Sequence, residues 1–150
     1  MVIRGNGFSL PELLVVMALM GIAIAIGIPL VNEQVRIAEV RATADQLALH
    51  LRAARMASVT RHEAIEFKVF VDPQNYYSYT ATSGKPFDVK TPDGVKIVAA
   101  PIPIIRFKQN GSVDVAASIV LESRVSGARE RWTASVSEMG MATLVHERVN

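Results

Sequence analysis

Residues 7–31 read GFSLPELLVVMALMGIAIAIGIPLV, and this stretch decides the architecture of the chain. The part from residue 13 to residue 31 contains no charged or strongly polar side chain. As an α-helix with a rise of about 1.5 Å per residue, that part is roughly 28 Å long, close to the thickness of the hydrocarbon core of a bilayer. We therefore predict that it crosses a membrane.

A cleaved secretory signal is the ordinary alternative for an apolar segment at this place, with Arg4 as its positively charged start. The apolar region of such a signal has about 7 to 15 residues and ends at a cleavage site of small residues. Here the run is longer, and Pro29 is followed by charged residues instead. The positive charge of Arg4 also favours an N-terminus in the cytoplasm.

The helical pattern continues beyond the apolar run, but with one apolar face only. Steps of three and four residues connect Ile37, Val40, Ala44, Leu47, Leu51, Ala54 and Ser58. We predict one helix from about residue 9 to about residue 60, roughly 75 Å long, with a kink at Gly27 and Pro29. Because alanines interrupt the apolar face, packing against a sheet is favoured over a free coiled coil.

From residue 64 to residue 150 the pattern alternates as in a β-sheet. Ile65, Phe67, Val69 and Val71 share one side of a first strand. A turn at 72–75 leads to a strand at 76–82, residues 83–94 are predicted to be a loop, and Asn110–Gly111 signals a hairpin. Three more strands are predicted at 118–125, 131–137 and 142–147. The fold class is therefore α+β, with a long N-terminal helix packed against a C-terminal antiparallel β-sheet domain.

The composition and the scattered histidines argue against an enzyme. The chain has no cysteine, which excludes disulfides, thiolate metal sites and cysteine nucleophiles. His50, His62 and His146 lie in three different predicted elements and are not at ligand spacing from carboxylates, so we expect them on the surface. We predict no catalytic residues, no metal and no cofactor.

The basic and aromatic residues allow a second interpretation. Arg41, Arg52, Arg55 and Arg61 could form a stripe for phosphates, but a net charge of +2 favours a solvated helix face paired with Glu39 and Asp45. Aromatic side chains on strands usually pack in a core rather than stack on bases, and this applies to Tyr76, Tyr77, Tyr79 and Trp132. We expect Trp132 to be buried.

Glu12 is a carboxylate at the edge of the apolar run. Ser9 and Glu12 have the spacing of a capping box, and Pro11 suits a first helical turn. A cap contributes only about 1 kcal/mol, whereas an unpaired charge near hydrocarbon costs about 3 kcal/mol or more. If the chain were cut before Phe8, a new amino group would lie near the depth of Glu12, and a neighbouring molecule could supply it as the partner charge.

The residues that carry this pattern resemble the class III leader and N-terminal helix of type IV pilins and pseudopilins. The resemblance rests on Gly7, Phe8, Glu12, the apolar helix and Pro29. It implies cleavage after Gly7, N-methylation of Phe8 by a prepilin peptidase on the cytoplasmic face, and packing of subunits into a helical filament. Glu12 would make the salt bridge between subunits. The implied domains are a leader at 1–7, a membrane-spanning and filament-core half of the helix at 8–31, and a globular domain at 32–150.

The later segments are similar to the GspH/FimT group of minor pilins and pseudopilins. They are LALHLRAARMASVTRHEAIEFKV at 47–69, IIRFKQNGSV at 104–113 and WTASVSEMGMATL at 132–144. The resemblance implies a structural subunit of a type II secretion pseudopilus or a type IV pilus. It would sit in the bacterial inner membrane as a single-pass protein with a periplasmic globular domain, and then in the filament, with other pilins as partners.

Two alternatives to an assembly subunit differ in class. Some members of the GspH/FimT group bind DNA during uptake through basic residues near a late glycine, which makes a DNA-binding minor pilin the chief alternative. In this chain Met141 and Thr143 stand where arginines would be needed, so nucleic acid is not expected among the partners. A membrane-anchored enzyme is a more distant alternative and would require a cleft with convergent polar side chains.

Overall fold

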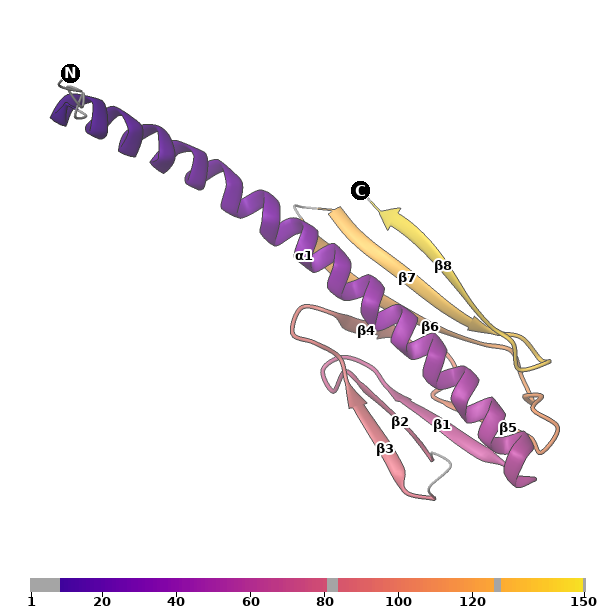
Figure 1. The fold of residues 1–150 in the computed structure, drawn as a ribbon. Coiled ribbons are helices and arrows are strands. Elements are labelled where there is room, and N and C mark those ends of the chain that lie inside the picture. The colour runs from indigo at the N-terminus through magenta and orange to yellow at the C-terminus, as the bar shows by residue number, and fades with distance from the viewer. Residues whose placement is uncertain (1–8, 81–83, 126–127, 150) are drawn as a thin grey trace. The chain divides into compact units, whose positions relative to one another are not determined.

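The computed structural model describes residues 9–80, 84–125 and 128–149. Within these residues one helix, α1 (Leu10–Arg61), precedes eight strands, which confirms the predicted helix almost to the residue (Figure 1). The chain divides into two compact units, Met1–Val35 and Arg36–Asn150. We call the second unit the head and describe each unit by itself.

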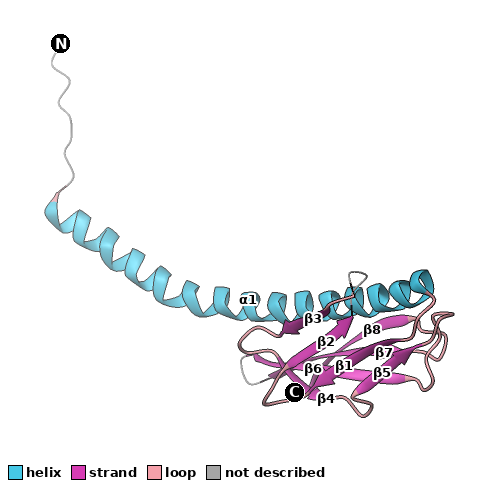
Figure 2. Cartoon of the chain, turned by 90° about the horizontal axis from the view of Figure 1, so that it is seen from below, coloured by secondary structure: helices cyan, strands magenta, loops and turns pink. Residues whose placement is uncertain are grey.

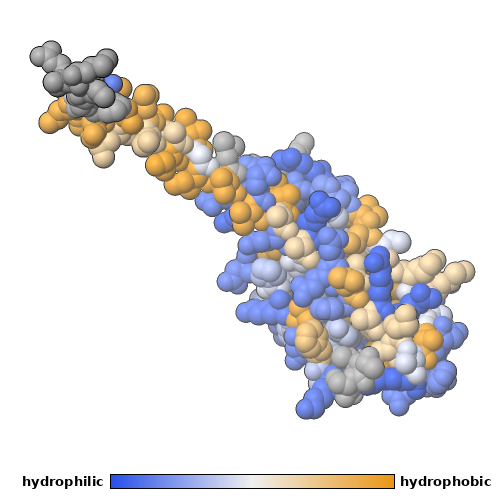
Figure 3. All heavy atoms as spheres, in the orientation of Figure 1, coloured by the Kyte–Doolittle hydropathy of each residue, from blue (hydrophilic) through white to orange (hydrophobic). Residues whose placement is uncertain are grey.

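The part of α1 that lies in the first unit is apolar and exposed. Residues 10–26 are all exposed, and Figure 3 shows a nearly continuous hydrophobic surface along this part of the helix. By length and composition this helix is able to cross a membrane. The Ser9 carbonyl oxygen accepts a hydrogen bond from the Leu13 amide at 3.2 Å, so Ser9 is the N-cap residue. Pro11 then lies in the first turn, where its missing N–H costs nothing.

The part of α1 in the head buries the face that the sequence predicts. Val40, Ala44, Leu47, Leu51 and Ala54 are essentially inaccessible to solvent, and they belong to the hydrophobic core. Figure 2 shows the strands beneath this part of the helix. The opposite helix face is solvated and largely polar, although Leu49 and Met56 are also exposed on this part of α1. This is the amphipathic arrangement of a helix packed on a sheet.

The C-terminal end of α1 is closed by main-chain hydrogen bonds. His62 has a φ of 55°, in the left-handed region where a helix cannot continue. The Glu63 amide donates to the Ser58 carbonyl at 3.3 Å and the His62 amide to the Val59 carbonyl at 3.4 Å. This is a Schellman motif, which satisfies two of the terminal carbonyl groups.

The strands form two antiparallel sheets, as predicted for the C-terminal domain. The first has the order β3-β2-β1-β5, with β1 (Ile65–Phe70), β2 (Tyr76–Thr80), β3 (Pro86–Lys90) and β5 (Ile104–Phe107). The second has the order β4-β6-β7-β8, with β4 (Lys96–Ala99), β6 (Ala117–Val125), β7 (Ala128–Val136) and β8 (Ala142–Val149). Both sheets contribute to one core, which also receives the buried face of α1.

Two local predictions for the sheets are wrong, and one strand was not predicted. Residues 83–94, predicted to be a loop, contain the edge strand β3. Pro86 is the first residue of β3, a position in an edge strand where a proline, which has no N–H to donate, is tolerated. Val71 lies beyond the end of β1 and is 40% exposed, so it does not share the buried side of that strand. The sequence prediction also omitted β4, a short edge strand.

The predicted hairpin at Asn110–Gly111 is present as a short turn. The Gly111 amide donates to the Lys108 carbonyl at 2.8 Å, and the Lys108 amide donates to the Ser112 carbonyl at 2.8 Å. Gly111 has a φ of 78°, which glycine adopts without strain. The turn closes a single bridge between Phe107 and Val113 rather than a long pair of strands.

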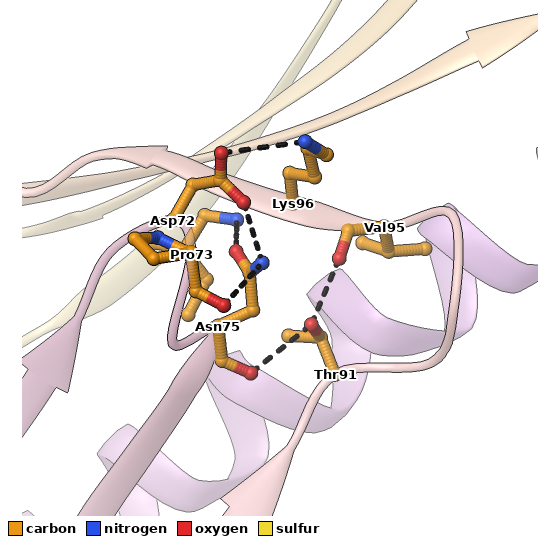
Figure 4. Close-up of polar contacts among 7 residues, drawn as sticks. Asp72, Pro73, Asn75, Thr91, Val95 and Lys96 are labelled. Atoms are coloured by element: carbon orange, nitrogen blue, oxygen red, sulfur yellow. Dashed lines mark hydrogen bonds and ion pairs between the residues drawn. The ribbon is translucent and has the colours of Figure 1, made fainter.

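A cluster of polar contacts connects the two sheets (Figure 4). Asn75, in the β1–β2 turn with a φ of 50°, donates from Nδ2 to Asp72 at 2.8 Å and accepts from the Ile97 amide of β4 at 2.9 Å. Thr91 donates from its amide to the Asn75 carbonyl at 3.0 Å. Lys96 lies 3.3 Å from Asp72, and together with the Asn75 hydrogen bond it lowers the pKa of that carboxyl. Asparagine suits the position because it tolerates left-handed backbone.

A fragment that starts near Asn32 is expected to be a soluble, folded α+β protein. All the long uninterrupted apolar surface precedes that residue, and the core of the head lies entirely after it. Circular dichroism and gel filtration of the purified fragment check this expectation. Aggregation of several fragments with different start points between residues 28 and 36 would contradict the proposed boundary at 31/32.

Candidate functional site

Glu12 lies exposed in the first turn of α1, among exposed apolar side chains such as Leu10 and Leu13. The capping box that its spacing suggests is not formed. Within residues 9–80, 84–125 and 128–149, neither the Ser9 hydroxyl nor the Glu12 carboxylate makes a hydrogen bond or an ion pair. A carboxylate with no partner among these residues requires one from elsewhere if the surrounding apolar surface is taken out of water.

The other predicted residues of the N-terminal site are placed only in part. Gly7 and Phe8 lie outside the residues that the structure describes. The helix runs without interruption through Gly27 and residue 29. A Cβ atom added at Gly27 would meet no heavy atom within 4 Å, so no packing partner in this chain explains that glycine. The kink at Gly27 and Pro29 stays a prediction.

A second feature is a groove of about 590 Å³ between the C-terminal end of α1 and the start of β8. It is lined by Arg52, Arg55, Met56, Val59 and residues 140–143. Most of these lining groups are apolar, and Met56 and Met141 are 66% and 53% exposed. We call this feature the arginine groove.

Two glycines and an arginine build one wall of the arginine groove. Gly140 has a φ of 75°, and a Cβ atom added there would lie 2.0 Å from the carbonyl oxygen of Gly111. The same carbonyl accepts a hydrogen bond from Arg55 Nε at 3.1 Å. The two loops therefore touch through main-chain atoms, with the side chain of Arg55 laid across both.

The arginines predicted as a single stripe have different surroundings. Arg41 lies 4.0 Å from Asp45, one turn along the helix, which is the pairing expected on a solvated helix face. Arg52 and Arg55 instead donate to main-chain carbonyls, Arg52 Nη2 to Ala142 at 3.4 Å and Arg55 Nε to Gly111. The stripe is therefore partly an ordinary helix surface and partly the wall of a groove.

The prediction that the three histidines are surface residues is wrong for His50. Its ring is half-buried among Tyr77, Tyr79 and Phe87, and Nδ1 shares a hydrogen bond of 2.8 Å with the Tyr77 hydroxyl. Burial lowers the pKa of His50 and raises that of Tyr77, so both groups are neutral near pH 7. His62 is exposed, as predicted.

His146 is exposed but has a carboxylate partner, which its separation in sequence did not indicate. Its Nε2 lies 2.6 Å from Glu130, a residue that is only 3% exposed and whose other oxygen lies 3.3 Å from Arg148. The His146 ring stacks on Trp132 at 4.6 Å. In the described residues, no group of three or more histidine, aspartate or glutamate side chains could hold a metal ion.

The aromatic residues behave largely as core residues. Tyr77 and Tyr79 are buried and stack on Phe67, while Tyr76 stacks on Phe70. Trp132 is half-buried instead of fully buried. It lies on β7 opposite His146 of β8, and its ring is covered by the His146 ring, which is itself exposed.

Comparison with known proteins identifies an N-terminal sequence motif and a shared fold. Residues 4–28 match the family model of the prokaryotic N-terminal methylation motif. The fold is similar to that of the type IV minor pilin FimU of Pseudomonas aeruginosa, with a TM-score of 0.52 and 17% sequence identity over 73% of this chain and 88% of that one. The fold of the chain is pilin-like. No match is found among curated proteins.

A second solved structure has the same fold as the pilin-like chain. It is the minor pseudopilin EpsH from the type 2 secretion system of Vibrio cholerae, with a TM-score of 0.57 and 12% sequence identity over 72% of this chain and 97% of that one. A second crystal form of FimU gives a TM-score of 0.53 and 18% sequence identity, with 70% of this chain and 91% of that one covered.

The arginine groove was not predicted from the sequence of the pilin-like chain. Its parts come from α1, from the turn at residues 108–112 and from the β7–β8 turn, and their proximity is a property of the tertiary fold. The only signals were two glycines, Gly111 and Gly140, each next to predicted turns. Glycine at a turn indicates a left-handed residue, but not which other loop it touches.

Proposed function

We propose that the pilin-like chain is a minor pilin or pseudopilin, a structural subunit of a type II secretion pseudopilus or a type IV pilus. The observation that carries the proposal is Glu12, a carboxylate that has no partner among the described residues and lies in an exposed apolar helix, inside a matched N-terminal methylation motif. A prepilin peptidase would cut after Gly7 and methylate Phe8, and other pilins would be the partners in a helical filament.

In this proposal the two units of the chain have different environments. Residues 8–31 anchor the protein in the inner membrane as a single span, with the N-terminus in the cytoplasm and the globular domain in the periplasm. In the filament the same helical segment lies among the helices of neighbouring subunits. There the amino group of Phe8 from one subunit pairs with the Glu12 carboxylate of another, so that both charges are neutralised in a dry environment.

The proposed function does not include binding of DNA. Met141 and Thr143, the exposed residues that follow Gly140, carry no charge. Apolar side chains make up most of the lining around Arg52 and Arg55. Binding of a nucleic acid backbone depends on several basic side chains that contact successive phosphates, so two arginines in an apolar groove do not favour it.

Mass spectrometry of the protein extracted from membranes is the direct test. Co-expression with a prepilin peptidase is expected to yield a chain that begins at N-methylated Phe8, because the leader at 1–7 is removed. In the absence of the peptidase the same chain should begin at Met1. A mature chain that begins at Met1 despite the peptidase, or one cut beyond residue 29, would overturn the proposal.

A further inference from the structure

The arginine groove combines an apolar floor with two positive charges that lack carboxylate partners. Several other arginines of the head are paired: Arg106 lies 2.7 Å from Glu66, and Arg148 lies 3.3 Å from Glu130. Within the part of the chain that the structure describes, Arg52 and Arg55 form no ion pair. The groove is therefore positively charged and uncompensated, beside the side chains of Met56, Val59 and Met141.

Both guanidinium groups are held in place before any partner arrives. Arg55 uses Nε for the Gly111 carbonyl and is confined by Gly140, which leaves its two terminal nitrogens free to donate. Arg52 is oriented by the Ala142 carbonyl. Arginine presents two parallel N–H groups that match the two oxygens of a carboxylate, and a fixed side chain loses less conformational entropy on binding.

The groove also opens onto an unpaired strand edge. β8 is the last strand of its sheet, and one of its edges faces no other strand. The Met141 carbonyl accepts a hydrogen bond from the Ser137 amide across the β7–β8 turn. Because the main-chain groups of successive residues in a strand point to alternate sides, those of the next residue, Ala142, point away from β7. Arg52 reaches this outward carbonyl. An extended segment could therefore add to β8 and pass over the arginines.

We propose that the arginine groove binds an extended acidic segment of a partner protein. The segment pairs with the free edge of β8, places a carboxylate on Arg52 and Arg55, and packs a neighbouring aliphatic side chain against Met56, Val59 and Met141. The apolar lining favours such a segment over nucleic acid, because a phosphate backbone gains nothing from contact with methionine and valine. This surface is separate from the helix contacts of the proposed filament, and its test does not depend on assembly.

The test uses the full chain in detergent micelles and peptides selected against it from a random phage library. We expect the selected peptides to carry an aspartate or glutamate next to an aliphatic residue. Replacement of the acid in the synthetic peptide by its amide should weaken binding about tenfold or more. The double variant Arg52→Gln, Arg55→Gln should weaken it similarly, whereas Arg61→Gln, on the same helix but outside the groove, should change it less than about twofold.

Met141→Glu provides a variant that spares the folded core, because this side chain is 53% exposed. The added negative charge should weaken the binding of acidic peptides about tenfold, while the matched Met141→Gln, which loses the apolar contact but adds no charge, should weaken it clearly less. Three results would each overturn the proposal. They are selection of no peptide, selection of peptides indifferent to these variants, and tighter binding of a 20-base-pair DNA duplex that the same arginine variants abolish.

Discussion

Gly140→Ala is expected to destabilise the head by about 3 kcal/mol or more, since two separate costs add. A left-handed φ, here 75°, costs a residue with a side chain about 1 to 2 kcal/mol. The new Cβ atom would also lie 2.0 Å from the Gly111 carbonyl oxygen, so one of the two loops must move. Because that oxygen accepts from Arg55 Nε, a shift also disturbs this hydrogen bond.

Urea denaturation followed by circular dichroism measures the effect on the fragment that starts at Asn32. Gly94→Ala is the matched control, because Gly94 has a φ of 100° but no heavy atom within 4 Å of the added Cβ position. That control should cost only the conformational term, about 1 to 2 kcal/mol. Equal losses of stability in the two variants would show that the contact between Gly111 and Gly140 is unimportant.

The long helix was predictable because its signals are local. The apolar run is continuous, and the four-and-three spacing of Val40, Ala44 and Leu47 repeats within a few residues. All three of these side chains lie in the core. The strand β1 was predictable for the same reason, with alternate burial of Ile65, Phe67 and Val69. Its end was misplaced by one residue because Val71 continues the apolar alternation into the turn.

The edge strands β3 and β4 were missed because nothing in their own sequence requires a sheet. In β3 four of five residues are exposed, so burial imposes no alternation on that stretch, although the Phe87 ring contacts Tyr79 of β2 at 5.8 Å between centroids. Similarly, His50 is half-buried only because β2 and β3 bring Tyr77 and Phe87 to the helix. A residue that is buried by strands 27 or more positions away in sequence gives no local signal of its burial.

Glu12 could be selected from the sequence for a different reason, which is the cost of its charge. No contact in the described structure explains a carboxylate at the start of this apolar helix, and within the described residues Glu12 does not make the expected capping hydrogen bond. The residue was identified by energetics and by its position relative to Phe8, not by a periodic pattern. Such reasoning locates a charge that needs a partner, but the partner itself lies outside the chain.

Glu12→Gln is accordingly expected to leave the single molecule intact and to abolish its recruitment beside partner pilins. The substitution keeps the size of the side chain and its ability to cap the helix, and it removes only the negative charge. If Glu12 served as a cap alone, the variant would lose about 0.5 kcal/mol of helix stability and nothing else. If Glu12 pairs with the Phe8 amine of a neighbour, the substitution leaves that desolvated amine without its counter-charge, at a cost of about 3 to 5 kcal/mol.

Co-purification with the partner pilins, measured together with leader cleavage, separates these outcomes. The expected result is normal membrane insertion and normal cleavage after Gly7, with recruitment reduced by about a hundredfold, as a loss of about 3 kcal/mol implies. Glu39→Gln is the matched control, because Glu39 is an exposed carboxylate on the same helix but outside the apolar run. If Glu12→Gln is recruited as well as the parent protein, the carboxylate acts only within its own helix. The proposed pairing of Glu12 with Phe8 between subunits would then have to be abandoned.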